Sequence, residues 1–299
     1  MRIAHISDLH FSSPSFSFMQ LFSKRWIGNI NLLFNRRQKY SNNQSSSLPE
    51  LFHRLNVDYV FITGDLTTTS HPKEYAIAHR FLDQLNHYKL TTFLIPGNHD
   101  HYTKRAEKQR RFYSYFHLDS SQLTPQFTLK EHGVASYALT KKWVLIALDT
   151  TCATPFYSSN GFFSQATETH LRNLLLSLPQ DRHIILMNHF PFLPIGRPRR
   201  HLRNGLKLAA ILKSDSRIRL YLHGHTHQQS TADLRDQTLP ITLDSGSASF
   251  ERGSWNLLDL HEVEDQCNLT TYTWENASWQ PHHKKNFQWN PQIKTPSQS

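Results

Sequence analysis

The 299-residue chain is predicted to adopt an α/β fold, and three observations support this class. Short apolar runs that end in glycine, proline, asparagine or aspartate recur along the chain, as is typical of buried strands. Segments with apolar residues three and four positions apart lie between these runs, as is typical of helices. Hydrophobic residues make up 38% of the chain, enough for a sizeable core, so disorder over the whole length is excluded.

Strands and helices are expected to alternate along most of the chain. The expected strands are residues 3–6, 59–63, 92–95, 144–148, 184–187 and 218–222. The expected helices are residues 70–88, 164–178 and 204–213, with Ser164 as an N-cap. This alternation indicates a layered architecture in which the loops after the strand ends carry the ligands. Polar clusters follow all six expected strands.

Two regions interrupt the alternation. Residues 11–47 form an insertion that mixes bulky apolar and basic side chains and contains no acidic residue. Its last part, residues 42–47, is expected to be a polar loop. Residues 276–299 are rich in asparagine, glutamine and proline, and we expect them to form a polar, frayed C-terminal tail. The main domain is then expected to span residues 1–275, with residues 11–47 as a cap insertion.

The positive charge of the chain is local. Lysine and arginine number 33 and aspartate and glutamate 23, which gives a net charge of +10. The excess lies in the insertion and in residues 182–214, and such patches attract phosphate, nucleic acid or anionic lipid headgroups. Two cysteines do not make a disulfide framework, so we expect a reduced cytoplasmic protein. We expect neither a secretory signal nor a transmembrane helix.

The polar clusters supply two carboxylates, one amide oxygen and four imidazoles as candidate metal ligands. They are Asp8, His10, Asp65, Asn98, His189, His225 and His227. A mixed oxygen and nitrogen set without thiolate suits Mn²⁺, Fe or Zn²⁺ and disfavours a structural zinc site. Seven ligands are too many for one ion with an open position, whereas two ions that share a carboxylate would use them all. Such a pair can hold a bridging hydroxide for in-line attack on phosphorus.

The order of these blocks resembles the calcineurin-like metallophosphoesterase superfamily, over residues 8–227. The blocks are Asp8-Leu9-His10, Gly64-Asp65, Gly97-Asn98-His99-Asp100, His189 and Gly224-His225-Thr226-His227. The resemblance implies a four-layer αββα sandwich of two mixed sheets flanked by helices. It also implies two divalent cations, with Mn²⁺ favoured and Fe or Zn²⁺ as alternatives.

The resemblance assigns a role to each candidate. Asp8, His10 and His227 would bind the first metal, and Asn98, His189 and His225 the second, with Asp65 as the bridge. His99 would not be a ligand. It would donate a proton to the leaving oxygen or stabilise the charged transition state, and Asp100 would orient its ring.

The substrate has to be judged from what surrounds the centre, because the superfamily includes phosphatases, nucleotidases, cyclic nucleotide phosphodiesterases, nucleases and pyrophosphatases of nucleotide-linked lipids. Residues 16–39 are either a buried helical cap or an amphipathic flap at a membrane surface. Four arginines follow His189 and either clamp a second phosphate or form a solvated basic loop. They are Arg197, Arg199, Arg200 and Arg203.

These two features favour a nucleotide-linked glycolipid as substrate. In them the chain is most similar to the UDP-2,3-diacylglucosamine pyrophosphatases of lipid A biosynthesis, which release 2,3-diacylglucosamine 1-phosphate and UMP. This reading places the protein in the cytoplasm, peripherally on the inner membrane face, with no nucleic-acid partner. The alternatives are a soluble cyclic-nucleotide phosphodiesterase and a membrane- or nucleic-acid-binding module with a vestigial metal site.

Overall fold

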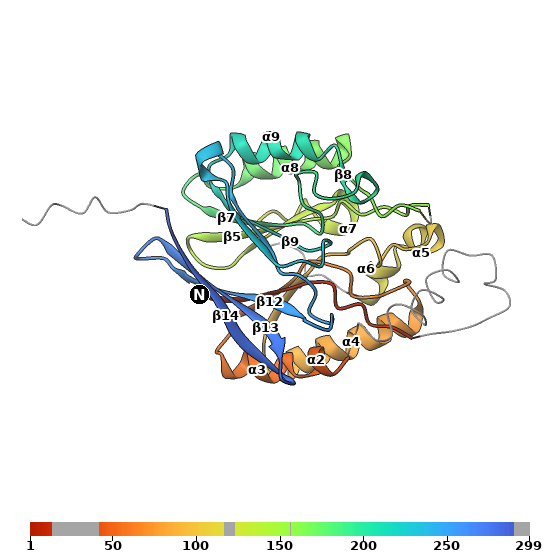
Figure 1. Cartoon of the computed structure of the whole chain (residues 1–299). Helices are drawn as coiled ribbons and strands as arrows, with labels where there is room; N and C mark the ends of the chain where they lie inside the picture. Colours follow the sequence, from red (N-terminus) through yellow and green to blue (C-terminus); the bar gives the residue numbers. More distant parts are fainter. Residues whose placement is uncertain (14–41, 117–122, 156, 290–299) are drawn as a thin grey trace, which may run out of the picture.

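The computed structural model describes residues 1–13, 42–116, 123–155 and 157–289. Within these residues two six-stranded sheets are stacked on one another, and helices cover the outer face of each sheet (Figure 1). Both sheets mix parallel and antiparallel strands. The predicted α/β class and four-layer αββα sandwich are therefore confirmed.

The first sheet combines N-terminal and C-terminal strands. They are β1 (Arg2–Ile6), β2 (Tyr59–Ile62), β3 (Thr91–Leu94), β12 (Ser254–His261), β13 (Gln266–Glu275) and β14 (Ser278–Gln288). Their order is β14-β13-β12-β1-β2-β3. The central strand β1 is parallel to β2 and antiparallel to β12, so the C-terminal strands extend the sheet on the side of β1 opposite β2.

The second sheet comes from the middle of the chain. Its strands are β4 (Val134–Ala138), β5 (Trp143–Leu148), β7 (His183–Met187), β9 (Ile218–His223), β10 (Ser230–Asp233) and β11 (Ile241–Asp244). Their order is β10-β11-β9-β7-β5-β4, with β5, β7, β9 and β11 parallel. A separate small sheet pairs β6 (Gly161–Phe162) with β8 (Leu202–Arg203).

Helices form the two outer layers (Figure 1). Those on the first sheet are α2 (Asn42–Ser46), α3 (Leu48–Arg54) and α4 (Pro72–His87), and those on the second are α8 (Gln165–Ser177) and α9 (Gly205–Ser214). The short helices α5 (Lys104–Lys108), α6 (Arg111–Tyr115) and α7 (Leu129–His132) lie between β3 and β4. The Ser164 side chain accepts a hydrogen bond from the Thr167 N–H and caps α8, so the predicted N-cap is confirmed.

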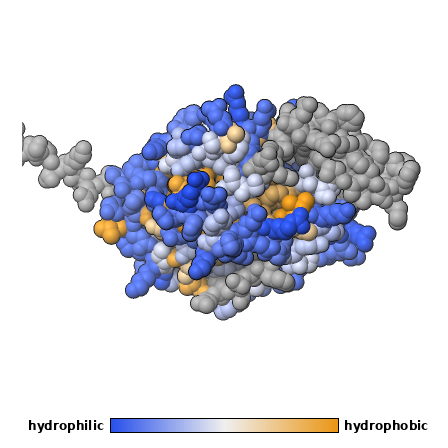
Figure 2. Space-filling model, turned by 90° about the horizontal axis from the view of Figure 1, so that it is seen from below, coloured by the Kyte–Doolittle hydropathy of each residue, from blue (hydrophilic) through white to orange (hydrophobic). Residues whose placement is uncertain are grey.

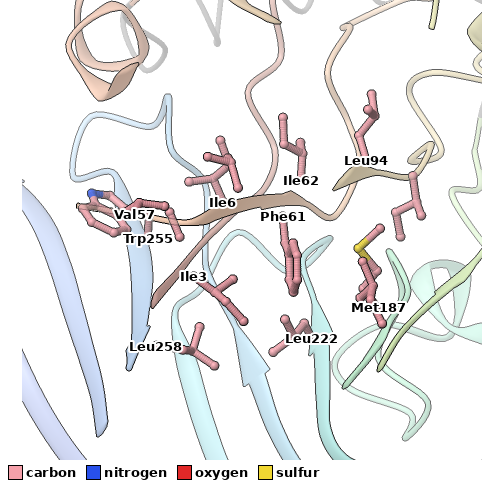
Figure 3. Close-up of a cluster of buried hydrophobic side chains, with 14 of the residues drawn as sticks. Ile3, Ile6, Val57, Phe61, Ile62, Leu94, Met187, Leu222, Trp255 and Leu258 are labelled. Atoms are coloured by element: carbon pink, nitrogen blue, oxygen red, sulfur yellow. The ribbon is translucent and has the colours of Figure 1, made fainter. Parts of the chain in front are cut away.

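Apolar side chains fill the space between the two sheets (Figure 3). Ile3, Phe61 and Leu258 project from the first sheet and Met187 and Leu222 from the second, and all five are fully buried. Burial of each such side chain is worth roughly 1.5–3 kcal/mol. This packing fixes one sheet against the other, so that the loops after their parallel strands lie at a common edge.

Two sequence expectations are wrong. Residues 42–46 form the helix α2 and not a loop, and residues 278–288 form the strand β14 and not a frayed tail. β14 is the edge strand of its sheet and pairs with β13 along its whole length. Only its residues Trp279 and Phe287 are buried, which explains why its polar composition did not suggest a strand.

The predicted cap insertion lies mostly outside the described residues, so its reading as a buried cap or a membrane flap stays a prediction. In the part of the chain that the structure describes, no helix combines the length and apolar character needed to cross a membrane. Viewed from below, the molecular surface is mainly hydrophilic, with apolar residues exposed in a few small groups (Figure 2).

Candidate metal centre

The structure brings all seven predicted ligands together at the edge where the parallel strands of both sheets end. Asp8 and His10 follow β1, Asp65 follows β2, and Asn98 follows β3 in the first sheet. In the second sheet His189 follows β7, and His225 and His227 follow β9. Six of the seven are buried, and His227 is partly exposed.

Four of these side chains form a first cluster, made of Asp8, His10, Asp65 and His227. One ligand atom from each lies within 4.8 Å of the others. The Nε2 atom of His227 is 3.0 Å and that of His10 is 3.5 Å from Asp8 Oδ1. His10 Nε2 also lies 3.1 Å from His227 Nε2 and 3.8 Å from Asp65 Oδ2.

A second cluster forms around the same Asp65 oxygen. His189 Nε2 lies 3.5 Å from Asp65 Oδ2, 3.2 Å from Asn98 Oδ1 and 3.3 Å from His225 Nδ1. Asp65 Oδ2 therefore faces His10 of the first cluster and His189 of the second. This is the position that a carboxylate shared by two cations requires.

In both carboxylates one oxygen is fixed by a main-chain N–H group, and the other oxygen faces the histidines of the clusters. Asp8 Oδ2 accepts a hydrogen bond from the main-chain N–H of His225 at 3.0 Å, and Asp65 Oδ1 accepts one from that of His99 at 2.7 Å. Among the described residues none donates a well-formed hydrogen bond to the buried Asp8 Oδ1, which faces imidazole nitrogens. A buried carboxylate oxygen in this situation fits a bound cation.

Two imidazoles of the second cluster are oriented by main-chain carbonyls. His189 Nδ1 lies 2.7 Å from the Thr63 carbonyl, and His225 Nε2 lies 2.9 Å from the Arg200 carbonyl. Because a carbonyl only accepts, each of these nitrogens carries the ring hydrogen. When these rings are neutral, the lone pairs of His189 Nε2 and His225 Nδ1 are therefore left for the cluster, as in metal-binding histidines.

The backbone at five of the seven candidates is left-handed. The φ angles are 54° at Asp8, 46° at His10, 54° at Asp65, 71° at His225 and 60° at His227. Residues other than glycine rarely adopt such angles, and they persist where surrounding contacts determine them, often at functional sites.

Close approach explains two motif glycines. A Cβ on Gly97 would lie 2.1 Å from Asp65 Oδ1, and one on Gly224 would lie 2.5 Å from Asp8 Oδ2. Larger residues at these positions would displace the two carboxylates.

The charges of the centre depend on one another. Burial alone would raise the pKa of Asp65, but the imidazoles of His189, His99 and His10 outweigh it and lower that pKa. Burial lowers and the Asp65 carboxylate raises the pKa of His189, and the net result is about 9. Burial and the neighbouring His189 lower the pKa of His225 to about 3. Without a cation, the second cluster therefore holds an Asp65–His189 ion pair.

His99 lies beside the centre, but Asp100 does not orient it. The ring centroid of His99 is 4.8 Å from that of His10, and its Nδ1 lies 2.6 Å from the Thr68 carbonyl. The predicted role of Asp100 is wrong in this respect. Its carboxylate accepts hydrogen bonds from the main-chain N–H groups of Gly97, Leu66 and Thr67 and from the Thr67 hydroxyl, and so fixes the loop that carries Asn98 and His99.

The four arginines expected to bind substrate are exposed and lie in residues 197–203, a segment at the rim of the second cluster that ends in β8. Its link to the centre is the Arg200 carbonyl that contacts His225. Arg199 lies over the Tyr157 ring at 5.8 Å, and Arg203 lies over the Phe162 ring at 4.7 Å. Among the described residues none of the four forms an ion pair with an acid. This rim thus offers positive charge and aromatic surface together.

Sequence reasoning missed several residues that support the ligands. Thr63 and Thr68 act through main-chain carbonyls, which leave no signal in a sequence. Asp244, Ser247 and Ser249 also contact the ligand loops. Here a signal was present, because the apolar run 241–243 ends in Asp244 just as the other apolar runs end in polar residues.

Comparison with known proteins identifies the family of the chain. A family model described as "Calcineurin-like phosphoesterase" matches residues 1–229. The chain is 26% identical over 179 residues to the 3′,5′-cyclic adenosine monophosphate phosphodiesterase CpdA of Haemophilus influenzae, a match that covers 59% of this chain and 57% of that protein. It is 26% identical over 250 residues to the glycerophosphodiester phosphodiesterase GpdQ of Enterobacter lignolyticus, with coverage of 81% and 78%.

A solved structure has a similar fold. A dimetal phosphatase from Danio rerio superposes with a TM-score of 0.66 at 13% identity, covering 97% of this chain and 99% of that one. The family model and the phosphodiesterase relatives support the predicted class of metal-dependent phosphoester hydrolase. Since the family model matches more than half of its length, the chain belongs to the calcineurin-like phosphoesterase family.

Proposed function

We propose that the protein is a phosphodiester or diphosphate hydrolase that uses two divalent cations held by the seven clustered side chains. The observation that carries this proposal is the position of Asp65, whose Oδ2 faces both clusters. Bound cations would stabilise the negative charge of a phosphoryl group and lower the pKa of a water molecule. Mn²⁺ is the ion that we propose, with Fe or Zn²⁺ as alternatives.

The protein's own groups prepare the site for this chemistry. Asp8 and Asp65 supply the negative charge that holds cations, while Asn98 contributes a neutral oxygen and keeps the site attractive to an anionic substrate. We propose that His99 donates a proton to the leaving oxygen. Because its Nδ1 hydrogen is directed at the Thr68 carbonyl, Nε2 is the atom that transfers the proton.

The substrate that we propose first is UDP-2,3-diacylglucosamine, cleaved to 2,3-diacylglucosamine 1-phosphate and UMP. The rim of the second cluster supports it, because it carries four arginines that form no ion pair within the described residues and so suit a diphosphate. Two exposed apolar side chains lie near these arginines and suit an acylated substrate: Phe162 packs under Arg203, and Ile195 precedes Arg197 by two residues. Contact with a membrane through residues 16–39 belongs to this proposal.

A cyclic nucleotide is the second candidate, and the comparisons favour it. CpdA is named for the hydrolysis of cyclic AMP, and GpdQ for that of glycerophosphodiesters. Small phosphodiesters of this kind need no acyl-binding surface. The exposed apolar residues at the rim would then have no role in catalysis.

A parallel assay in Mn²⁺ separates these candidates. UDP-2,3-diacylglucosamine in detergent micelles, 3′,5′-cyclic AMP, a glycerophosphodiester and single-stranded DNA are compared at equal concentration, with Asp65→Asn as the inactive control. We expect release of UMP from the first substrate. Turnover of cyclic AMP alone would contradict the lipid substrate and support the second candidate, a cyclic nucleotide. Absence of turnover on every phosphoester would contradict the hydrolase proposal and favour a binding module.

A further inference from the structure

We propose that residues 244–249, which begin at the end of β11, are a positioning element of the metal centre. They contact both the loop after β1 and the loop after β9, and so hold ligands of both clusters in place. The proposal rests on the metal centre described above. It extends the centre beyond residues 1–229, which the family model matches.

Asp244 fixes the residue between two ligands. Its carboxylate is fully buried, and its Oδ2 accepts a hydrogen bond from the Thr226 hydroxyl at 2.6 Å. Thr226 separates His225 of the second cluster from His227 of the first. The Thr226 oxygen in turn accepts the main-chain N–H of Gln228 at 3.1 Å, so it ties both sides of the loop to Asp244.

Two serines hold the other loop. The hydroxyls of Ser247 and Ser249 donate to the main-chain carbonyl of Asp8 at 2.7 Å and 3.0 Å, and both serines are buried. The Ala248 N–H donates to the Ser7 carbonyl at 3.0 Å. Three hydrogen bonds thus fix the backbone of Ser7 and Asp8 from the direction of the C-terminal segment.

These contacts matter because the ligands have left-handed backbones. Asp8, His225 and His227 all have positive φ angles, which the chain does not adopt without support. The element itself is anchored on the first sheet, where Asn256 of β12 donates to the Asp244 carbonyl and Thr271 of β13 donates to Asn256. The C-terminal strands are therefore connected to the metal ligands through buried polar contacts.

The test measures Mn²⁺ binding and not turnover, in Thr226→Val, Thr226→Ser, Asp244→Asn and the Thr226→Val/Asp244→Asn double variant. Dissociation constants come from calorimetry, and melting temperatures without metal report folding. The matched control is Thr124→Val, which removes a buried hydroxyl that bonds Ser136. Each titration is run well below the melting temperature of the variant.

Loss of an outer contact to a metal ligand typically weakens metal binding about 10–100-fold, and we expect this for Thr226→Val and Asp244→Asn. Thr226→Ser keeps the hydroxyl and should bind like the wild type, as should Thr124→Val. Both single variants alter the Thr226–Asp244 bond, and Asp244→Asn also alters the contacts of this carboxylate with the Gly246 N–H and with His223. The double variant should therefore bind no more weakly than Asp244→Asn alone. The Ser247→Ala/Ser249→Ala variant tests the other loop, with an expected loss in the same range.

Two results would overturn the proposal differently. If the wild type binds Mn²⁺ and the variants bind it equally well, whatever their melting temperatures, the segment is only structural. If the wild type binds no Mn²⁺, the metal centre itself is wrong, and the positioning role fails with it.

Discussion

The two clusters of the metal centre share Asp65 but differ in charge. The first contains two carboxylates and two imidazoles, whereas the second contains one carboxylate, one amide and two imidazoles. An additional carboxylate strengthens the attraction for a cation, most of all where water is excluded. We therefore expect the first cluster to bind its cation more tightly than the second.

They also differ in protonation. His189 of the second cluster has a pKa raised to about 9, whereas burial lowers the pKa of His10 in the first. A cation that binds the second cluster near neutral pH must displace a proton from His189. A cation that binds the first cluster displaces no proton from His10. Both differences indicate ordered filling, with the first cluster occupied before the second.

The largest effect is expected from Asp65→Asn, which changes the residue that the two clusters share. A neutral amide in place of the bridging carboxylate should lower the affinity for both cations by more than the roughly 100-fold that loss of an outer contact causes. Elemental analysis of the purified variant should find less than one metal per chain. Asp259→Asn, which breaks the ion pair with Arg2, is the control and should retain the wild-type content. Two cations retained by Asp65→Asn would contradict a shared ligand.

His99→Asn tests whether turnover can be lost while both clusters still bind their cations. Removal of a general acid typically lowers turnover by about 10²–10⁴-fold, and the metal content should not change. Bis-p-nitrophenyl phosphate has a leaving group that needs no proton, so its hydrolysis should fall much less than that of a natural diester. An equal loss on both substrates would remove the proposed proton transfer from His99.

Asn98→Asp and Asp8→Asn change the charge difference directly. Asn98→Asp adds a carboxylate to the second cluster and should raise its affinity for a cation roughly 10-fold. The reason is that an extra charge contact is worth about 1–2 kcal/mol in this setting. Asp8→Asn should lower the affinity of the first cluster for its cation by a similar factor. Calorimetric titration with Mn²⁺ resolves the two binding steps. Unchanged steps in both variants would show that charge does not set the order of filling.

The pH dependence should differ between the two steps. His189 is protonated below its pKa of about 9, and the cation of the second cluster needs it neutral. Affinity in the second step should therefore fall about tenfold for each pH unit below 9, while the first step changes less. Titrations between pH 6.5 and 8.5 measure this. A second step with no pH dependence would contradict the Asp65–His189 ion pair.

The metal ligands could be predicted from the sequence because each follows an apolar run at a strand end. The order of parallel strands explains the convergence within each sheet. The meeting of the two sheets at one edge was expected only from the family resemblance. The role of Asp100 could not be predicted in this way. A carboxylate next to His99 in sequence suggests a pair, yet donors from Leu66 and Thr67, far away in the chain, surround it in the structure.

The C-terminal strands escaped prediction for another reason. β14 has polar residues on an exposed edge, so apolar periodicity gives no sign of it. Asp244 was not among the candidates, and its bond to Thr226 appears only when β11 pairs with β9. The substrate was inferred only from the composition of residues 16–39 and of the segment with the four arginines, and it stays a prediction.

The most direct test of the account is anomalous diffraction from crystals of the protein grown with Mn²⁺. The account predicts two manganese peaks, one among Asp8, His10 and His227 and one among Asn98, His189 and His225, with Asp65 in contact with both. A single peak, or a pair of peaks that Asp65 does not join, would contradict it.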